Sequence, residues 1–174
     1  LLPSESSQQF DLRGNAAGSA GMAQATTAGS STFCEPAKYS DFLHLPYGLK
    51  GYFEYEQGME CAREFNKLVF IDFEGHARSN CKQIKAQVWS DPRVQRILQE
   101  EYVVISLYVD DRTKLPEEDW ITSEYDGKVK KTLGKKNLDL QITKFNSNTQ
   151  PFYVLLDTEG NLLTEPYGFD LNAD

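Results

Sequence analysis

Two short stretches of the chain are almost continuously apolar. They are residues 68–72 and residues 102–110. Runs of this length and composition are typical of strands that are covered on both faces, as parallel strands are. A third stretch, residues 150–157, is followed by Thr-Glu-Gly-Asn and a second apolar pair at residues 162–163. This order predicts a strand, a tight turn and an antiparallel strand.

Helical spacing of apolar side chains marks the segments between these strands. A first helix is expected within residues 53–66, and a second begins at Ser79 and continues to Trp89. Ser90 is expected to cap a further helix whose first turn contains Pro92. The apolar positions that define these helices are Tyr55, Met59, Ala62, Phe65, Ile84, Val88, Val94, Ile97 and Leu98.

Two other segments are predicted in the second half of the chain. Residues 111–137 are polar and rich in lysine, so we expect a surface excursion with a hairpin around Asp126-Gly127. A short helix is expected over residues 138–145. Its inward positions would be Leu138, Ile142 and Phe145.

The N-terminal part of the chain has a different composition. Residues 3–32 consist mainly of Ser, Ala, Gly, Thr and Gln, which bury too little apolar surface to offset the entropy of ordering. Residues 33–50 are aromatic and interrupted by proline, as in an irregular strap. We therefore expect residues 1–50 to be a linker and strap, and residues 51–174 to form one α/β domain.

Composition excludes some functions. The 174 residues are 40% hydrophobic, enough for one core of ordinary size. A net charge of −8 argues against a basic surface that binds the phosphate backbone of nucleic acid, so nucleic acid is not an expected partner. No apolar run approaches the roughly 20 residues of a membrane-spanning helix, and the first residues lack the basic start of a signal peptide.

The three cysteines, Cys34, Cys61 and Cys81, leave at least one thiol unpaired. Their spacing predicts no zinc site, and a disulfide between Cys34 and Cys61 is one possibility that spacing does not decide. His76 and Cys81 alone are a weak metal signal, so His44 and His76 are interpreted as exposed histidines. We expect neither a metal nor a cofactor.

The most informative segment is residues 71–82, Ile-Asp-Phe-Glu-Gly-His-Ala-Arg-Ser-Asn-Cys-Lys. It resembles the active-site segment of the C-terminal periplasmic thioredoxin-like domain in the DsbD thiol:disulfide interchange family. That family has a strand with a buried Asp, six residues before a Cys-x-x-Cys motif at a helix start. Asp72 matches the Asp, Cys81 matches the second cysteine, and Arg78 stands in place of the first. The resemblance extends over residues 52–170 and includes Ser-Asp-Pro at 90–92 and Gln-Pro at 150–151.

The resemblance implies a thioredoxin-like fold, with a central mixed sheet flanked by helices and a cis-proline at Pro151. It also implies a final helix on the sheet, whereas the chain stops near residues 170–174. We therefore expect the C-terminal helix to be missing and the sheet face it leaves to be covered by residues 1–50 or by another chain.

The resemblance also assigns the site residues. Cys81 and Asp72 are the catalytic candidates, and Arg78, Gln150 and Pro151 are candidates for contact with substrate. Asp72 has a second interpretation, as a strand-end Asp bonded to nearby backbone, and Cys81 has one as an inert, half-buried cysteine. A further family position near the thiols, acidic in many members, is Lys85 in this chain.

Two functions follow. The first is that of a DsbD-type protein-disulfide reductase domain, belonging to thiol:disulfide interchange and cytochrome c maturation, impaired because dithiol exchange needs a second thiol where Arg78 stands. The second is that of a redox-inactive module that binds extended peptide segments beside Pro151. In the first case, the partners are protein thiols and disulfides, and the location is the periplasm, tethered to the inner membrane through an upstream region. Cys34 or Cys61 could replace the lost thiol only within about 7 Å, Cα to Cα, of Cys81.

Overall fold

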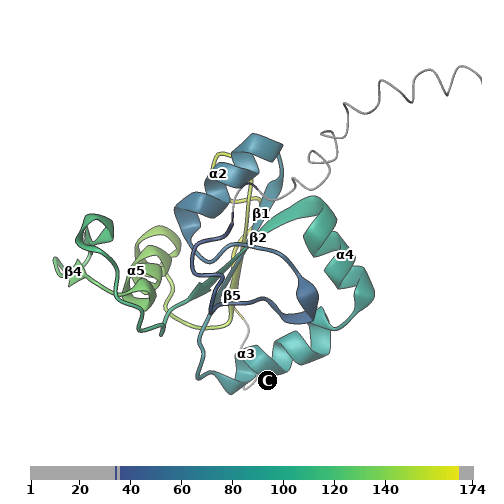
Figure 1. Ribbon diagram of the computed structural model, residues 1–174, viewed down its shortest axis with the longest axis horizontal. Coiled ribbons are helices and arrows are strands. Elements are labelled where there is room, and N and C mark those ends of the chain that lie inside the picture. The colour runs from purple at the N-terminus through teal and green to yellow at the C-terminus, as the bar shows by residue number, and fades with distance from the viewer. Residues whose placement is uncertain (1–33, 35, 169–174) are drawn as a thin grey trace, which may run out of the picture. The chain divides into compact units, whose positions relative to one another are not determined.

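The computed structural model describes residue 34 and residues 36–168 (Figure 1). The chain divides into two units, residues 1–34 and 35–174. The described helices and strands all belong to the second unit. The interpretation of residues 3–32 as a low-complexity linker concerns residues outside the described ranges.

A four-stranded mixed sheet, in the order β2-β1-β5-β6, forms the centre of this unit. β1 runs parallel to β2 and antiparallel to β5, and β5 runs antiparallel to β6. The strands are β1 (Leu68–Glu74), β2 (Tyr102–Tyr108), β5 (Phe152–Leu156) and β6 (Tyr167–Gly168). Each apolar run of the sequence is therefore a strand, and the expected mixed α/β fold is confirmed.

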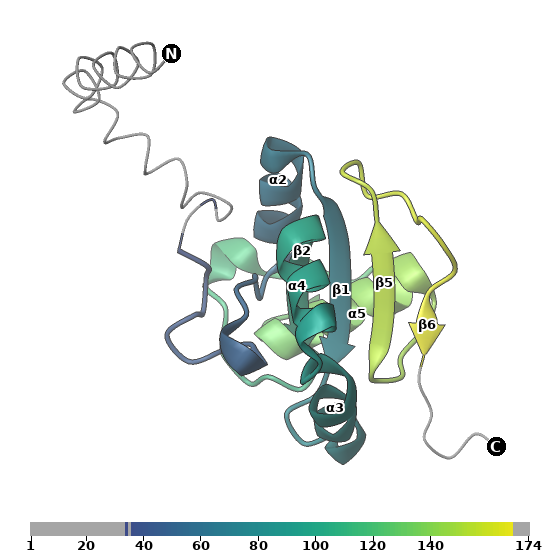
Figure 2. The ribbon, with the colours of Figure 1, turned by 90° about the vertical axis from the view of Figure 1, so that its right-hand side faces the viewer.

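Helices cover both faces of the sheet. Figures 1 and 2 show α2 and α5 on one face and α4 on the other, with α3 beyond the carboxyl end of β1. The helices are α2 (Tyr55–Phe65), α3 (Ser79–Ile84), the π-helix η2 (Lys85–Trp89), α4 (Pro92–Glu101) and α5 (Leu133–Phe145). The fold therefore has three layers, with the sheet between two layers of helices.

The two faces of β1 differ in chemistry because successive side chains of a strand point to opposite faces. On one face the side chains are apolar and fully buried, and Phe73 packs against Phe145 of α5. The other face carries Phe70, which packs against Trp89, and beyond it two acidic residues. One face of β1 is thus an apolar core, while the α4 face contains the carboxyl groups of Asp72 and Glu74.

The N-cap of α4 differs from the prediction. The capping residue is Asp91, whose extended backbone (φ −73°, ψ 122°) lets its carboxylate accept from the Arg93 N–H at 2.8 Å. Ser90 is still helical, and its hydroxyl donates to the Ala86 carbonyl. The prediction of Ser90 as the cap was wrong by one residue because the helical conformation of η2 continues through it.

α5 starts five residues before the predicted residue 138. Thr132 caps it, accepting from the Lys135 N–H at 3.3 Å. Its buried side chains include Asn137 and Gln141, whereas the predicted inward residues are only half-buried. Asn137 donates to the Tyr108 carbonyl and Gln141 to the Thr149 carbonyl. Because these buried positions are occupied by amides, the spacing of apolar residues does not show where the helix begins or which face is buried.

The polar excursion contains the expected hairpin. β3 (Ile121–Thr122) and β4 (Val129–Lys130) pair antiparallel, and Gly127 has a positive φ of 72° in the turn between them. A short helix, η3 (Glu117–Asp119), precedes them. The antiparallel strand expected at residues 162–163 is reduced to one bridge, Leu156 to Leu162, and the pairing partner of β5 is instead β6.

Residues 36–50 form a strap that contains η1 (Pro46–Gly48). Lys50 exchanges two hydrogen bonds with the Gln99 side chain of α4, and Tyr52 bonds to the outer edge of β2. The strap therefore lies at the β2 edge. We expected residues 1–50 or another chain to cover the sheet face beside β5. The described part of the strap does not cover that face.

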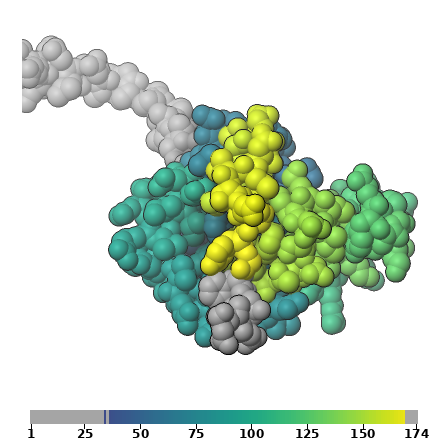
Figure 3. All heavy atoms as spheres, turned by 180° about the vertical axis from the view of Figure 1, so that it is seen from behind, coloured from purple at the N-terminus to yellow at the C-terminus, as the bar shows by residue number. Residues whose placement is uncertain are grey.

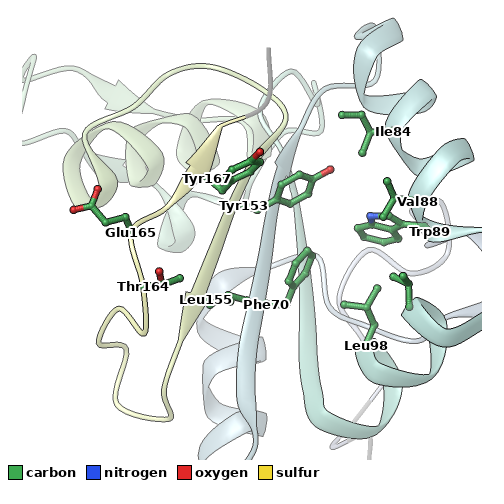
Figure 4. Close-up of a pocket in the computed structure, with 11 residues that line it drawn as sticks. Phe70, Ile84, Val88, Trp89, Leu98, Tyr153, Leu155, Thr164, Glu165 and Tyr167 are labelled. Atoms are coloured by element: carbon green, nitrogen blue, oxygen red, sulfur yellow. The ribbon is translucent and has the colours of Figure 1, made fainter. Parts of the chain in front are cut away.

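That face instead carries an apolar groove of about 340 Å³ between α4 and β5–β6 (Figures 3 and 4). Its walls include Phe70, Trp89, Leu98, Tyr153 and Tyr167. Tyr167 is 62% exposed. Separately, none of the helices that the structure describes is long and apolar enough to cross a membrane.

Gly58 sets the distance between α2 and β2. A Cβ atom at Gly58 would lie 2.4 Å from Cδ1 of Ile105, a side chain that is itself fully buried. We predict that Gly58→Ala lowers the free energy of unfolding by about 1–3 kcal/mol through overpacking, despite the better helix propensity of alanine. Urea denaturation measures this. The exposed Glu60→Ala on the same helix is the control, and equal stability of the two variants would contradict the prediction.

Candidate functional site

The loop that joins β1 to α3 is held by the carboxylate of Asp110, just after β2. Asp110 accepts from the backbone N–H of His76 at 2.8 Å and of Ala77 at 3.1 Å. A Cβ at Gly75 would lie 2.8 Å from Cγ of Arg78 and 3.2 Å from the Asp110 carboxylate, so a larger residue there would require these side chains to shift. The carboxyl ends of the two parallel strands therefore fix the start of α3.

Arg78 occupies the N-cap position of α3. It has extended backbone angles (φ −92°, ψ 110°), its side chain is exposed, and it makes no side-chain cap. The first-cysteine position of the resembled motif is thus a cation at the surface. A guanidinium cannot attack a disulfide, so Arg78 can only contact a bound molecule.

Cys81 lies in the first turn of α3 and is the free cysteine of the described residues. It is only 2% exposed. Burial raises the pKa of the Cys81 thiol to about 11. A backbone hydrogen bond from Gly75 lowers this pKa, and the charges of Asp72 and Glu74 raise it. Because thiolate is the nucleophile, a thiol with this pKa is unreactive near neutral pH.

Asp72 is fully buried. Neither of its carboxyl oxygens has a hydrogen-bond partner among the described residues. Burial raises the pKa of Asp72 well above its usual range, the Glu74 charge raises it further, and Lys85 opposes them. The structure thus does not give Asp72 the backbone hydrogen bonds of its second interpretation.

Lys85 reaches this acid from the first turn of η2. Its Nζ forms a close ion pair with Oε1 of Glu74 and lies 3.6 Å from Oδ2 of Asp72. Ser106 of β2 donates to the other oxygen of Glu74, and Tyr108 also bonds to Glu74. The Lys85 side chain is 13% exposed and that of Glu74 only 4%. The position that we identified as a departure from the family is therefore paired with an acid on β1.

Glu74, Ser106 and Tyr108 were not among the site residues predicted from the sequence. The signal for Glu74 was present, since a residue two positions after Asp72 on a strand shares its face. Lys85 follows Cys81 by four residues, so both lie on one side of the helix. Ser106 and Tyr108 could not be found this way, because only the parallel register places them opposite Asp72 and Glu74.

Tyr153 borders the buried acid from β5. It is the register partner of Asp72 in the antiparallel pair. Burial is the main reason why the pKa of Tyr153 lies above its usual value, and the charges of Asp72 and Cys81 raise it further. Figure 4 shows Tyr153 at the wall of the apolar groove, on the side of Ile84 and Trp89. The groove and the buried acid thus share this side chain.

The Gln150-Pro151 bond is cis, as the resemblance implies. Nδ2 of Asn80 donates to the Gln150 carbonyl at 3.2 Å and so joins the start of α3 to this loop. The Gln150 side chain is buried and donates to Gln141 at 2.9 Å. If Gln150 contacts a substrate, it does so through its backbone. Contact of Arg78, Gln150 and Pro151 with a substrate stays a prediction.

The two histidines lie in different surroundings. The His76 ring stacks on Tyr108, with centroids 4.0 Å apart, and its Nε2 lies 2.9 Å from Oδ2 of Asp111. His44 is exposed, as expected. Across residue 34 and residues 36–168, no group of three or more His, Cys, Asp or Glu side chains could hold a metal ion.

No second thiol is available to Cys81 within the part of the chain that the structure describes. Cys34 and Cys61 are both disulfide-bonded. Cys61 is fully buried on α2, which lies beside the amino-terminal part of β1, whereas Cys81 lies at its carboxyl end (Figure 2). The route in which Cys34 or Cys61 replaces the lost thiol is therefore not supported.

Lys85 is the cation for two buried carboxyl groups. Removing one member of a buried ion pair leaves an uncompensated charge, so we predict that Lys85→Met lowers the free energy of unfolding by about 3–5 kcal/mol near neutral pH. Lys82→Met, at an exposed position one turn earlier, should change it by less than about 0.5 kcal/mol. Chemical denaturation of both variants tests this, and equal losses would refute the structural role of Lys85.

Comparison with known proteins agrees with this geometry. Residues 55–170 match the family model described as a thioredoxin-like domain. No curated protein matches the chain. Among solved structures, a DsbH oxidoreductase is similar with a TM-score of 0.51 and 16% identity, over 75% of this chain and 81% of that one.

Two further structures are more distant. A thioredoxin from Thermus thermophilus has a TM-score of 0.41 and 22% identity, over 60% of this chain and 62% of that one. A redox protein from Chlamydomonas reinhardtii has a TM-score of 0.45 and 12% identity, over 73% of this chain and 33% of that one. Since the family model matches residues 55–170, more than half of the chain, the chain belongs to the thioredoxin-like domain family.

Proposed function

We propose that this chain is a thioredoxin-like domain of the DsbD type that has lost dithiol exchange of its own. The observation that carries the proposal is the pairing of an exposed Arg78 with a Cys81 that is 2% exposed and has a pKa of about 11. Exchange needs one thiolate to attack and a second thiol to resolve the mixed disulfide. Neither is provided near the start of α3.

The DsbD assignment rests on the Asp72, Cys81, Ser-Asp-Pro and Gln-Pro positions of the sequence. With it we propose a periplasmic location and a tether to the inner membrane through a region upstream of this chain. Protein thiols and disulfides are the partner class of such a domain, with no cofactor. This domain would serve that system without turning over disulfides by itself.

A second candidate function is the binding of an extended peptide segment. It is favoured by the Asn80 to Gln150 hydrogen bond, which aligns the start of α3 with the loop before Pro151. Among the described residues, nothing accepts a hydrogen bond from the Gln150 N–H. We propose that the backbone of a bound strand pairs with this group. A module of this kind needs no thiol.

Reduction of insulin with dithiothreitol tests the first proposal. The chain should give no rate above the uncatalysed background, because Arg78 cannot attack a disulfide. Arg78→Cys restores Cys-x-x-Cys at the start of α3 and should raise the rate. The controls are Arg78→Ser, which removes the charge without adding a thiol, and Arg78→Cys with Cys81→Ser. Turnover by the unaltered chain would overturn the proposal.

An array of short unstructured peptides without cysteine tests the second. Ser79 is exposed and adjoins Asn80, so a tryptophan there would obstruct a segment lying along the Gln150 backbone. We predict that the chain retains a subset of the peptides, that Ser79→Trp loses them, and that Glu60→Trp on α2 keeps them. No retained peptide, or equal retention by both variants, would remove this function.

A further inference from the structure

Three ionisable side chains meet on the α4 face of the sheet at the end of β1. Asp72 is 0% exposed and Glu74 is 3% exposed, and Lys85 is the cation that both of them approach. If all three were charged, the cluster would carry one unbalanced negative charge in the interior. Since a buried uncompensated charge is strongly disfavoured, one of the two carboxyl groups holds a proton.

The contacts indicate which one. Glu74 has three partners, because Lys85 pairs with one of its oxygens, Ser106 donates to the other, and Tyr108 adds a further bond. Asp72 has the more distant Lys85, at 3.6 Å, and Glu74 itself, and its contact with Glu74 raises the pKa of Asp72. Hydrogen bonds to the charged form favour that form. Glu74 is therefore the carboxylate and Asp72 the neutral acid.

The other groups around Asp72 do not alter this balance. From β2 it faces Ser106, its register partner in the parallel pair, and from β5 it faces Tyr153. From α3 it acts on the Cys81 thiol. Lys85 is the basic group whose charge lowers the pKa of Asp72. The protonation state of Asp72 therefore depends on which of the two carboxyl groups pairs with Lys85.

We propose that Glu74 is a positioning residue that holds the Lys85 ammonium away from Asp72 and so keeps Asp72 a neutral acid beside Cys81. A neutral carboxyl group cannot take the thiol proton, so Cys81 remains a thiol. The inference rests on the proposed function, since it supplies a second cause, besides Arg78, for the loss of thiol chemistry. It also assigns Lys85 a role in the chemistry of the site.

The test is a pH titration of the side-chain carboxyl carbons by NMR, with Asp72→Asn to assign the Asp72 signal. In the unaltered chain, Asp72 should stay protonated well beyond the value of about 4 at which exposed Asp and Glu ionise. In Glu74→Gln, Asp72 is the remaining acidic partner of Lys85 in this cluster. The pKa of Asp72 should then fall by about one unit or more. Glu64→Gln, on the exposed surface of α2, should leave it unchanged.

The inference is overturned if Asp72 titrates like an exposed acid in the unaltered chain, or if Glu74→Gln leaves its titration where it was. Should Glu74→Gln fail to fold, the double variant Glu74→Gln with Lys85→Met removes both charges. Asp72 should then remain protonated to at least as high a pH as in the unaltered chain, and ionisation at lower pH would overturn the inference. The insulin assay remains separate, since turnover there contradicts the proposed function and not this titration.

Discussion

The structure at the carboxyl end of β1 depends on how two buried carboxyl groups share one ammonium group. Asp72 and Glu74 project from the same face of β1, and Lys85 meets them from the helix that follows the loop. The pairing ties α3 and η2 to the sheet at the point where β1 and β2 end. It also sets the charge that Cys81 experiences, because the Glu74 carboxylate disfavours a thiolate nearby.

The exposed part of the same loop is organised separately. Asp110 fixes the backbone at His76 and Ala77, and Asn80 connects α3 to the Gln150 carbonyl. These contacts fix the loop after β1 and join the start of α3 to the loop before Pro151. The scaffold for presenting a site to an extended segment is thus independent of the thiol. Because of this separation, a binding function does not depend on redox chemistry at Cys81.

The sequence predicts the elements whose burial is apolar and misses those whose burial is polar. The strands at residues 68–72 and 102–110 are recovered because both are packed on two sides, and the hairpin because Gly127 requires a positive φ. The start of α5 is missed because its buried Asn137 and Gln141 are satisfied by distant carbonyl groups.

The candidate site follows the same rule. Asp72, Arg78 and Cys81 are predicted from a motif that is local in sequence, and Pro151 from a separate Gln-Pro pair. Glu74 looks like the end of a strand, and only the three-dimensional pairing with Lys85 gives it a role. The partner of a buried charge comes from another element, at a separation that no local pattern specifies. Sequence reasoning therefore identifies the altered Lys85 position without the acid that compensates it.

The most direct test of an inert Cys81 is its rate of alkylation by iodoacetamide as a function of pH, in the folded chain with its disulfide intact. We predict a slow reaction whose rate rises only as the pH approaches about 11, and a return to ordinary thiol behaviour, near pH 8.5, in denaturant. Rapid alkylation of the folded chain below pH 8.5 would contradict this. Such a result would mean that Arg78 and the start of α3 stabilise a thiolate, and single-thiol chemistry at Cys81 would then be available.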